Sequence, residues 1–270
     1  YQLMRDAGIN ARAIAGQWAH NYPDQPDRHS EMGSGYGAEA YPNMSRMDWA
    51  VELYGWFDYY LKGIGPQPGQ WIEVQSNLGQ WRLEDRYPPE DAVEQRWELG
   101  TELTLESGGL TVFPDATSGP IWISDPVPET LHLVGTPRLH VEVRTATVGG
   151  QLYALLESCN ESGACIHVGH AIMDLRYHAG GDEIQSWAAP LASITALMEF
   201  MPLDATVPEG HTLRLSLRST GEDYLPATTS SVVTVIEGES STLQLDLVDI
   251  ENRLLFEPPV CLHERCLMAA

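Results

Sequence analysis

The sequence predicts a mainly β protein, in which a jelly-roll β-sandwich follows a short α/β segment. From about residue 70 onward, apolar residues recur at every second position, as at Leu213, Leu215 and Leu217, which is typical of half-buried strands. Turns rich in glycine and proline separate these segments, and no clear helical pattern interrupts them. Between residues 47 and 62, by contrast, apolar residues repeat with helical spacing.

The change of period marks a domain junction. Residues 63–69 contain three glycines and two prolines, a composition that interrupts regular structure. We therefore expect residues 1–65 to form the α/β segment, residues 66–257 the β-sandwich, and residues 258–270 a peripheral tail. The size of the sandwich favours a jelly roll with additional strands.

The strands of the sandwich are expected from alternation and from the position of turn residues. They cover residues 71–76, 95–105, 109–113, 139–143, 151–157, 166–177, 195–201, 213–217, 231–236 and 243–248.

The α/β segment is predicted to contain one strand and two helices. A first helix ends at Gly8, and the apolar run 11–15 is typical of a buried strand. A second helix is expected over 45–62, beginning with a capping box from Ser45 to Asp48 and ending at Gly63. It carries two apolar stripes, one formed by Met47, Ala50, Val51, Tyr54 and Leu61 and the other by Trp49, Leu53, Trp56 and Tyr60. Two stripes indicate burial on two sides of the helix.

The motif Gly16-Gln17-Trp18-Ala19-His20 directly follows the strand 11–15. An α/β-hydrolase presents its catalytic histidine on a loop after a strand, and its triad has the chain order nucleophile, acid, histidine. No serine or cysteine precedes His20, and the one acid there, Asp6, lies in the predicted helix. We expect His20 to be the general base of a triad whose nucleophile and acid lie on polypeptide upstream of this chain; the alternative is a loop histidine without a catalytic role.

The charge and apolar content of the chain exclude several classes of partner. A net charge of −23 repels nucleic acid and anionic membranes. No apolar run approaches the roughly 18 residues that span a bilayer. The loop after His20 contains the acidic residues and histidine Asp24, Asp27, His29 and Glu31, which we expect to form a solvated rim; the alternative is a site that binds the amino group of a substrate.

The four cysteines form two close pairs, Cys159 with Cys165 and Cys261 with Cys266. Two local disulfides would imply an oxidising compartment, such as the periplasm or the cell exterior. Free thiols and a four-cysteine zinc site are the alternatives, although the spacers exceed those usual for zinc.

His167 and His170 lie three apart in a predicted strand, so they should point to opposite faces and make a poor metal pair. We expect neither a metal nor another cofactor.

The chain resembles the family of X-Pro dipeptidyl-peptidases, cocaine esterases and α-amino-acid ester hydrolases (peptidase family S15, CocE/NonD). Five segments in the same order carry the resemblance: Gly16-Gln17-Trp18-Ala19-His20, the helix end Trp56-Phe57-Asp58-Tyr59-Tyr60-Leu61-Lys62-Gly63, Gln80-Trp81-Arg82 with Tyr87-Pro88-Pro89, Gly135-Thr136-Pro137-Arg138-Leu139, and Pro208-Glu209-Gly210-His211-Thr212-Leu213-Arg214-Leu215. Gln17 and Tyr87 replace a proline and a tryptophan of the family pattern.

The resemblance implies a serine hydrolase that cleaves a peptide, ester or amide bond through an acyl-enzyme. Of the family's catalytic residues only His20 carries over, so this chain alone should be inactive. Its implied partners are the upstream hydrolase core, a small substrate, and a second copy of the chain, since one stripe of the helix 45–62 is left without cover. The substrate could be an X-Pro peptide, an amino-acid ester or a β-lactam.

The competing hypothesis is a non-catalytic jelly-roll module that binds carbohydrate or protein. Such modules display aromatic side chains on a sheet face. The candidates are Trp71, Trp81, Trp97, Trp122 and Trp187.

Overall fold

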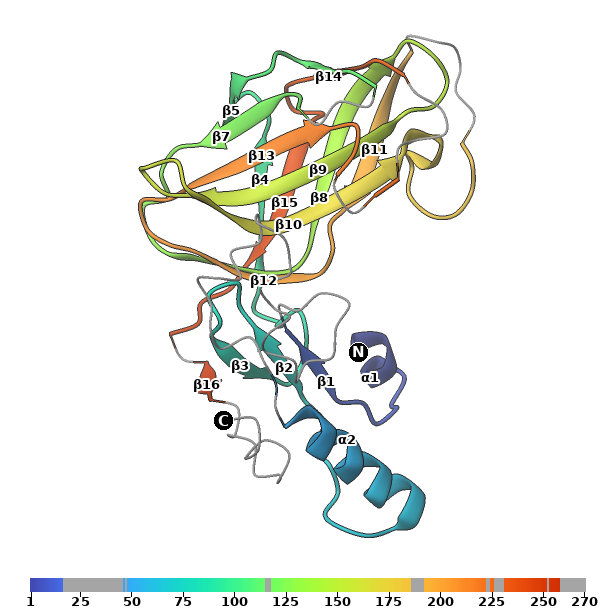
Figure 1. Ribbon diagram of the computed structural model, residues 1–270, viewed down its shortest axis with the longest axis vertical. Coiled ribbons are helices and arrows are strands. Elements are labelled where there is room, and N and C mark those ends of the chain that lie inside the picture. Colours follow the sequence, from blue (N-terminus) through green and yellow to red (C-terminus); the bar gives the residue numbers. More distant parts are fainter. Residues whose placement is uncertain are drawn as a thin grey trace. The chain divides into compact units, whose positions relative to one another are not determined.

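The computed structural model describes residues 1–16, 46, 48–114, 118–185, 192–221, 224–225, 231–251 and 253–257. The chain forms two compact units, which we describe separately: residues 1–91 with 249–270, and residues 92–248. Most of the regular structure of the described chain is β-strand, because the second unit is almost entirely strand, so the mainly β fold class is confirmed (Figure 1).

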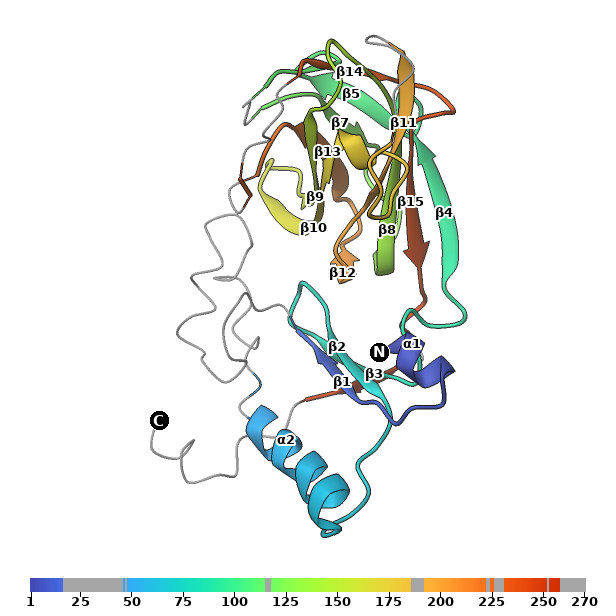
Figure 2. The ribbon, with the colours of Figure 1, turned by 90° about the vertical axis from the view of Figure 1, so that its right-hand side faces the viewer.

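The first unit contains short helices and a four-stranded sheet. Its elements are α1 (Gln2–Asp6), β1 (Ala13–Ala15), α2 (Trp49–Phe57), the π-helical turn η3 (Asp58–Lys62), β2 (Ile72–Gln75), β3 (Trp81–Glu84) and β16 (Leu254–Phe256). The strand order is β1-β2-β3-β16. Strands β1 and β2 are parallel and the other neighbours are antiparallel (Figure 2).

The limits of this unit differ from the domain junction expected at residues 65 and 66. Strand β2 follows that junction, yet it pairs with β1, with Ala13 opposite Ile72. The backbone N–H of Ala13 also donates to the carbonyl of Trp71 at 3.2 Å. A turn-rich segment shows where local structure breaks, but not which sheet the next strand joins. The compact unit therefore continues to Asp91.

The helical segment ends at Gly63, where the sequence predicts, although α2 itself ends at Phe57 and the last turn is the π-helical η3. Gly63 has a left-handed φ of 70°, and the N–H of Ile64 donates to the carbonyl of Asp58 at 3.1 Å. The start of the helix differs from the expected capping box. Asp48 is the N-cap residue, and its side chain makes no capping hydrogen bond because both carboxylate oxygens bind Arg46.

The second unit is a β-sandwich. Its elements are β4 (Val93–Glu98), β5 (Leu103–Ser107), β6 (Thr111–Val112), β7 (Ile121–Ser124), β8 (Leu131–Thr145), β9 (Gln151–Cys159), β10 (Cys165–Asp174), the 3₁₀ turn η4 (Leu175–Tyr177), β11 (Ser193–Glu199), β12 (Leu203–Val207), β13 (Thr212–Arg218), β14 (Val233–Ile236) and β15 (Thr242–Leu247). One sheet has the order β10-β9-β13-β7-β5. The other has the order β4-β15-β8-β14-β6, with β11 and β12 also paired to β8.

Strand β8 organises the larger sheet. Its one edge pairs with β12 and then β11, and its other edge pairs with β15 and then β14. Leu139, Val141 and Val143 are fully buried, as their alternation predicts, while His140 and Glu142 are only partly buried.

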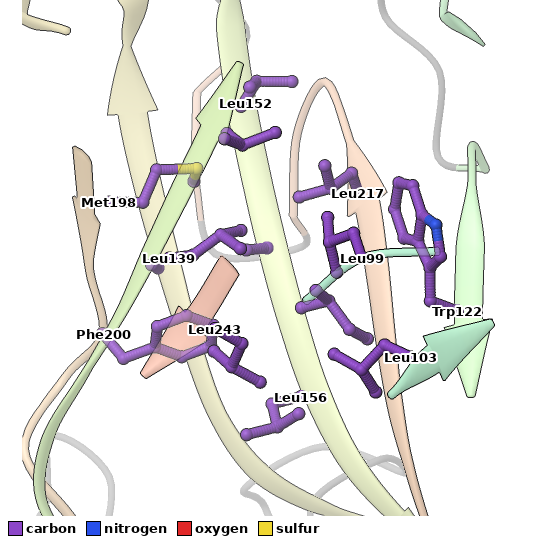
Figure 3. Close-up of a cluster of buried hydrophobic side chains, with 14 of the residues drawn as sticks. Leu99, Leu103, Trp122, Leu139, Leu152, Leu156, Met198, Phe200, Leu217 and Leu243 are labelled. Atoms are coloured by element: carbon purple, nitrogen blue, oxygen red, sulfur yellow. The ribbon is translucent and has the colours of Figure 1, made fainter. Parts of the chain in front are cut away.

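The core lies between the two sheets of the sandwich (Figure 3). Leu152 and Leu156 of β9 and Leu217 of β13 face residues of β8 and its neighbours there. Trp122 of β7 is also fully buried, and its indole Nε1–H donates to the Glu237 carboxylate at 2.7 Å. That bond satisfies the one polar atom of this side chain.

Short strands account for most differences from the predicted elements. The expected strand 95–105 is two strands, β4 and β5, separated by a turn at Gly100 with a φ of 96°. Strands β3, β7, β12 and β16 were not predicted, because alternation is hard to recognise over three to five residues. None of the described helices has the length and apolar character needed to cross a membrane.

Gly119 allows the β7 and β13 backbones to approach closely. A Cβ atom on this residue would lie 2.1 Å from the carbonyl oxygen of Leu217. The neighbouring Pro120 carbonyl accepts a hydrogen bond from the Leu217 N–H at 3.0 Å. The contact is with backbone, so no side-chain rotation can relieve it.

We therefore predict that Gly119→Ala lowers the free energy of unfolding by about 3 kcal/mol, as for an overpacked core. The matched control is Gly169→Ala, where the nearest atom is the mobile Cδ2 of Leu203 at 2.8 Å. This variant should lose less stability in urea unfolding. Equal losses would contradict the argument from the rigid Leu217 carbonyl.

Candidate functional site

The predicted catalytic residue His20 lies outside the described residues, as do Asp24, Asp27, His29 and Glu31 of the expected rim loop. The structure does describe strand β1 and Gly16, which lead to His20, and the side chains that hold this strand. These side chains form the frame of the candidate site.

Arg12, at the start of β1, connects this strand to two other elements. Its Nη1 lies 2.6 Å from Oε2 of Glu52 on α2. Its Nη2 lies 2.7 Å from Oε1 of Glu73 on β2, and its guanidinium carbon lies 4.8 Å from the centre of the Trp71 ring. The Trp71 indole donates to the same Glu73 oxygen at 2.9 Å. One carboxylate oxygen thus receives two donors from two segments of chain.

The second oxygen of Glu73 binds Arg46, whose side chain is 1% exposed. Arg46 also forms a two-pronged pair with Asp48, with Nε–Oδ1 and Nη2–Oδ2 distances of 2.7 and 2.8 Å. Its guanidinium carbon lies 4.9 Å from the centre of the Trp81 ring. Burial alone would lower the pKa of Arg46, but the hydrogen bonds and charges of Asp48 and Glu73 outweigh it and raise the pKa. Arg46 therefore stays charged.

A similar cluster centres on Glu84 of β3. Its Oε1 accepts from Arg82 at 2.6 Å, and its Oε2 accepts from Arg253 at 3.0 Å. Arg253 precedes β16, and Phe256 of that strand lies 6.2 Å, centre to centre, from Trp81. Glu84 thus helps to attach the last strand of the sheet.

Sequence analysis did not identify these frame residues. The sequence of β2, Ile-Glu-Val-Gln, alternates apolar and polar residues and so predicts an exposed Glu73, whereas the structure buries all four residues. Arg12 and Arg46 lie 61 and 27 residues from Glu73. The local pattern therefore gave no signal of the buried carboxylate or of its partners.

The other acidic residues considered for chemistry lie in ordinary surface positions. Asp6 belongs to α1 and accepts a hydrogen bond from Gln2 at 2.7 Å, which fits its exclusion as a triad acid. Asp58 and Lys62 form an exposed pair at 2.6 Å within η3. Among the described residues, no group of three or more histidine, cysteine, aspartate or glutamate side chains could hold a metal ion.

Cys159 and Cys165 form a disulfide between β9 and β10, the pairing that their spacing suggested. The two residues are directly opposite each other in the ladder of this hairpin. Cys261 and Cys266 fall in the part of the chain that the structure does not describe, so their pairing stays a prediction.

The expectation that His167 and His170 point to opposite faces is wrong. A β-bulge between His167 and Gly169 shifts the register of β10 against β9. In the ladder, His167 is therefore opposite Glu157 of β9, and His170 is opposite Leu155, two residues away on the same strand. The two histidines share one face of the sheet, and His167 Nε2 lies 3.1 Å from His170 Nδ1.

Two tyrosines surround His170. Its Nε2 lies 3.0 Å from the Tyr224 hydroxyl, and its ring stacks on Tyr153 with centres 5.8 Å apart. Burial, and then the proximity of His170, lowers the pKa of His167 to about 3. His167 is therefore neutral at neutral pH.

The tryptophans proposed for a carbohydrate-binding face do not form an exposed platform among the described residues. Trp81 and Trp122 are buried, and Trp71 and Trp97 are partly buried. Trp187 is not among the described residues.

The frame leads to a test of stability. We predict that Glu73→Gln lowers the free energy of unfolding of the first unit by about 3 kcal/mol, because it leaves Arg46 and Arg12 buried without their shared charge. Amide hydrogen exchange of β1 and β2 and urea unfolding would measure the loss.

The matched control for this substitution is Lys62→Gln, which removes an exposed pair and should change stability very little. The interpretation would be contradicted if Glu73→Gln were as mild as Lys62→Gln, or if exchange accelerated equally throughout both units.

Solved hydrolases share the fold of this chain. The α-amino acid ester hydrolase structure matches with a TM-score of 0.63 and 13% identity, over 91% of this chain and 52% of that one. A CocE/NonD family hydrolase from Staphylococcus aureus matches with a TM-score of 0.56 and 15% identity, over 74% and 46%. An aminopeptidase from a marine sediment archaeon, Thaumarchaeota archaeon, matches with a TM-score of 0.56 and 12% identity, over 73% and 43%. This chain therefore spans about half the length of these enzymes.

A comparison with curated protein sequences finds no significant match. Residues 63–253 match the model of the X-Pro dipeptidyl-peptidase C-terminal non-catalytic domain. This match covers well over half of the chain and contains the whole β-sandwich. The chain therefore belongs to the family of X-Pro dipeptidyl-peptidase C-terminal non-catalytic domains.

Proposed function

We propose that this chain is the C-terminal part of a serine hydrolase of the X-Pro dipeptidyl-peptidase and acyl-esterase type. The whole enzyme would hydrolyse a peptide, ester or amide bond through an acyl-enzyme, with its nucleophile and acid on polypeptide upstream of Tyr1. In this proposal, residues 1–65 complete the catalytic domain and supply His20, while the sandwich is non-catalytic.

The observation that supports the proposal is the parallel strand β1, which the histidine motif follows in the sequence. β1 pairs in parallel with β2 and ends at Ala15, five residues before His20. Such a strand is where an α/β-hydrolase carries its histidine loop. The likeness to the α-amino acid ester hydrolase covers 91% of the chain, which extends beyond the family match at 63–253.

The proposed chemistry assigns two proton transfers to His20. Its imidazole accepts the proton of the serine hydroxyl as the oxygen attacks the carbonyl carbon, and then donates that proton to the leaving group. Water is activated in the same way to release the acyl group. Such transfers require a fixed imidazole position. The ion pairs of Arg12 with Glu52 and Glu73 would supply this by holding the strand that precedes the loop.

Helix α2 offers a surface for the upstream core. In the stripe that contains Val51, Tyr54 and Leu61, Tyr54 is 68% exposed, Leu61 of the adjoining η3 is 76% exposed, and Val51 is also exposed. Apolar area of this kind on one helix marks a partner surface. The tryptophan stripe is more buried at Trp49 and Trp56, although Leu53 and Tyr60 are exposed. We propose that the upstream hydrolase core covers the stripe of Val51, Tyr54 and Leu61, and that isolated chains use it to self-associate.

The first functional prediction concerns turnover. The chain alone should not hydrolyse a p-nitrophenyl ester or an X-Pro anilide, whereas the protein that includes the upstream polypeptide should hydrolyse at least one of them. In that longer protein, His20→Ala should lower kcat by 10³-fold or more, because triad residues act as a unit.

The control for the turnover test is His29→Ala, nine residues after His20 in the expected rim loop, which should retain activity. Turnover by the isolated chain that His20→Ala abolishes would show that this chain contains its own nucleophile. An active longer protein that tolerates His20→Ala would refute the catalytic role of this residue.

The second functional prediction concerns assembly. Leu61→Glu should weaken both self-association in light scattering and co-purification with the upstream core, because it places a charge on the proposed interface. Leu225→Glu, at a more exposed leucine outside the helix, is the control and should change neither. A monomeric wild-type chain that also fails to bind the core would contradict the assignment of this surface.

A further inference from the structure

The bulge in β10 creates a pair of histidines that the function proposed above does not use. Both lie on the outer face of the five-stranded sheet, since their cross-strand neighbours Glu157 and Leu155 alternate with the buried Leu156. On β10 itself, Val168 and Ala171 point into the core. The two imidazoles are therefore next to each other outside the core.

The separation of the two nitrogens is that of ligands on one metal ion. His167 Nε2 and His170 Nδ1 are 3.1 Å apart. Two nitrogens at about 2.1 Å from an ion and at a right angle to each other lie about 3.0 Å apart, whereas a tetrahedral angle gives about 3.4 Å. A right angle between imidazole ligands is the geometry that Cu²⁺ and Ni²⁺ favour. We propose that His167 and His170 form a binding site for a divalent transition metal, with Cu²⁺ the preferred ion.

The surroundings of His170 support a ligand role. The Tyr224 hydroxyl lies at hydrogen-bond distance from Nε2, so it can hold the proton on that nitrogen and leave the lone pair of Nδ1 for the metal. Metal-binding histidines generally have such a partner on the second nitrogen. Tyr153 stacks against the same ring with an interplanar angle of 24° and limits its rotation. Tyr224 and Tyr153 thus act as positioning residues.

Metal binding conserves protons at this site. Without metal, and with the His170 proton on Nε2, His167 Nε2–H donates to His170 Nδ1. When a metal ion binds, the His167 proton moves from Nε2 to Nδ1 of His167. His167 Nε2 and His170 Nδ1 then each present a lone pair to the ion, and both imidazoles stay neutral.

Packing of the chain around Gly169 supports the geometry of the pair. A Cβ atom at this position would lie 2.8 Å from Leu203 and 3.5 Å from Phe200. Glycine therefore lets the bulged strand lie close to these side chains. The bulge sets His167 and His170 on the same side of β10, and so the site depends on the tertiary fold.

The site can be tested on the 270-residue chain by titration with CuCl₂, followed by calorimetry and electron paramagnetic resonance. An excess of Mg²⁺ would occupy the surface carboxylates, so that weak binding of Cu²⁺ to them does not obscure the histidine site. We expect one tight Cu²⁺ per chain with hyperfine splitting from two nitrogens. His167→Asn and His170→Asn should each weaken this binding at least tenfold, and Tyr224→Phe should weaken it about tenfold, as for loss of an outer-shell partner.

The control is His140→Asn on β8, which lies outside the pair and should bind Cu²⁺ as the wild type does. Circular dichroism would establish that each variant is folded. The nitrogen splitting in the wild type gives a readout that needs no variant. Absence of tight binding, a spectrum without two nitrogen ligands, or wild-type affinity in either histidine variant would overturn the proposal.

Discussion

The first unit depends on the Glu73 carboxylate, whose two oxygens bind two arginines from separate parts of the chain. Arg12 brings β1 and, through Glu52, α2 to this carboxylate, and Arg46 brings the residues that begin α2. A four-stranded sheet of such short strands buries little apolar area, so each strand needs additional attachment. Buried ion pairs contribute little net stability over apolar contacts, but they penalise every alternative pairing of the strands. The network thus fixes which segments meet.

All the basic residues of these clusters are arginine, in a sequence that has fourteen arginines and one lysine. The planar guanidinium can bind two carboxylates at once and also stack on an aromatic ring, as Arg46 does with Trp81. Glu84 repeats the arrangement in the next strand, where it joins Arg82 to Arg253. The ammonium group of lysine has neither the fork nor the flat face. The one lysine, Lys62, lies in an exposed pair where such geometry is not needed.

The sandwich could be predicted from the sequence far better than the frame. Strands such as β8 and β13 have one buried face, so alternation identifies both the strand and its core residues. The end of the helical segment at η3 could be predicted because only glycine readily adopts the left-handed conformation of Gly63. The partners of Glu73 could not be found, since local pattern carries no information about residues 27 or 61 positions away. The role of His20 was predicted from its motif alone, and it stays a prediction because this residue lies outside the described residues.

The histidines of β10 show how a single extra residue reverses a prediction about a site. The rule that residues three apart face opposite sides of a strand assumes an unbroken period of two. One bulged residue restores the same side, and with it the possibility that two ligands act together. A glycine within a strand is the sequence signal of such a break, and Gly169 stands between the two histidines. Where glycine separates two chemically active side chains in a strand, the same-face arrangement should therefore be considered before the pair is dismissed.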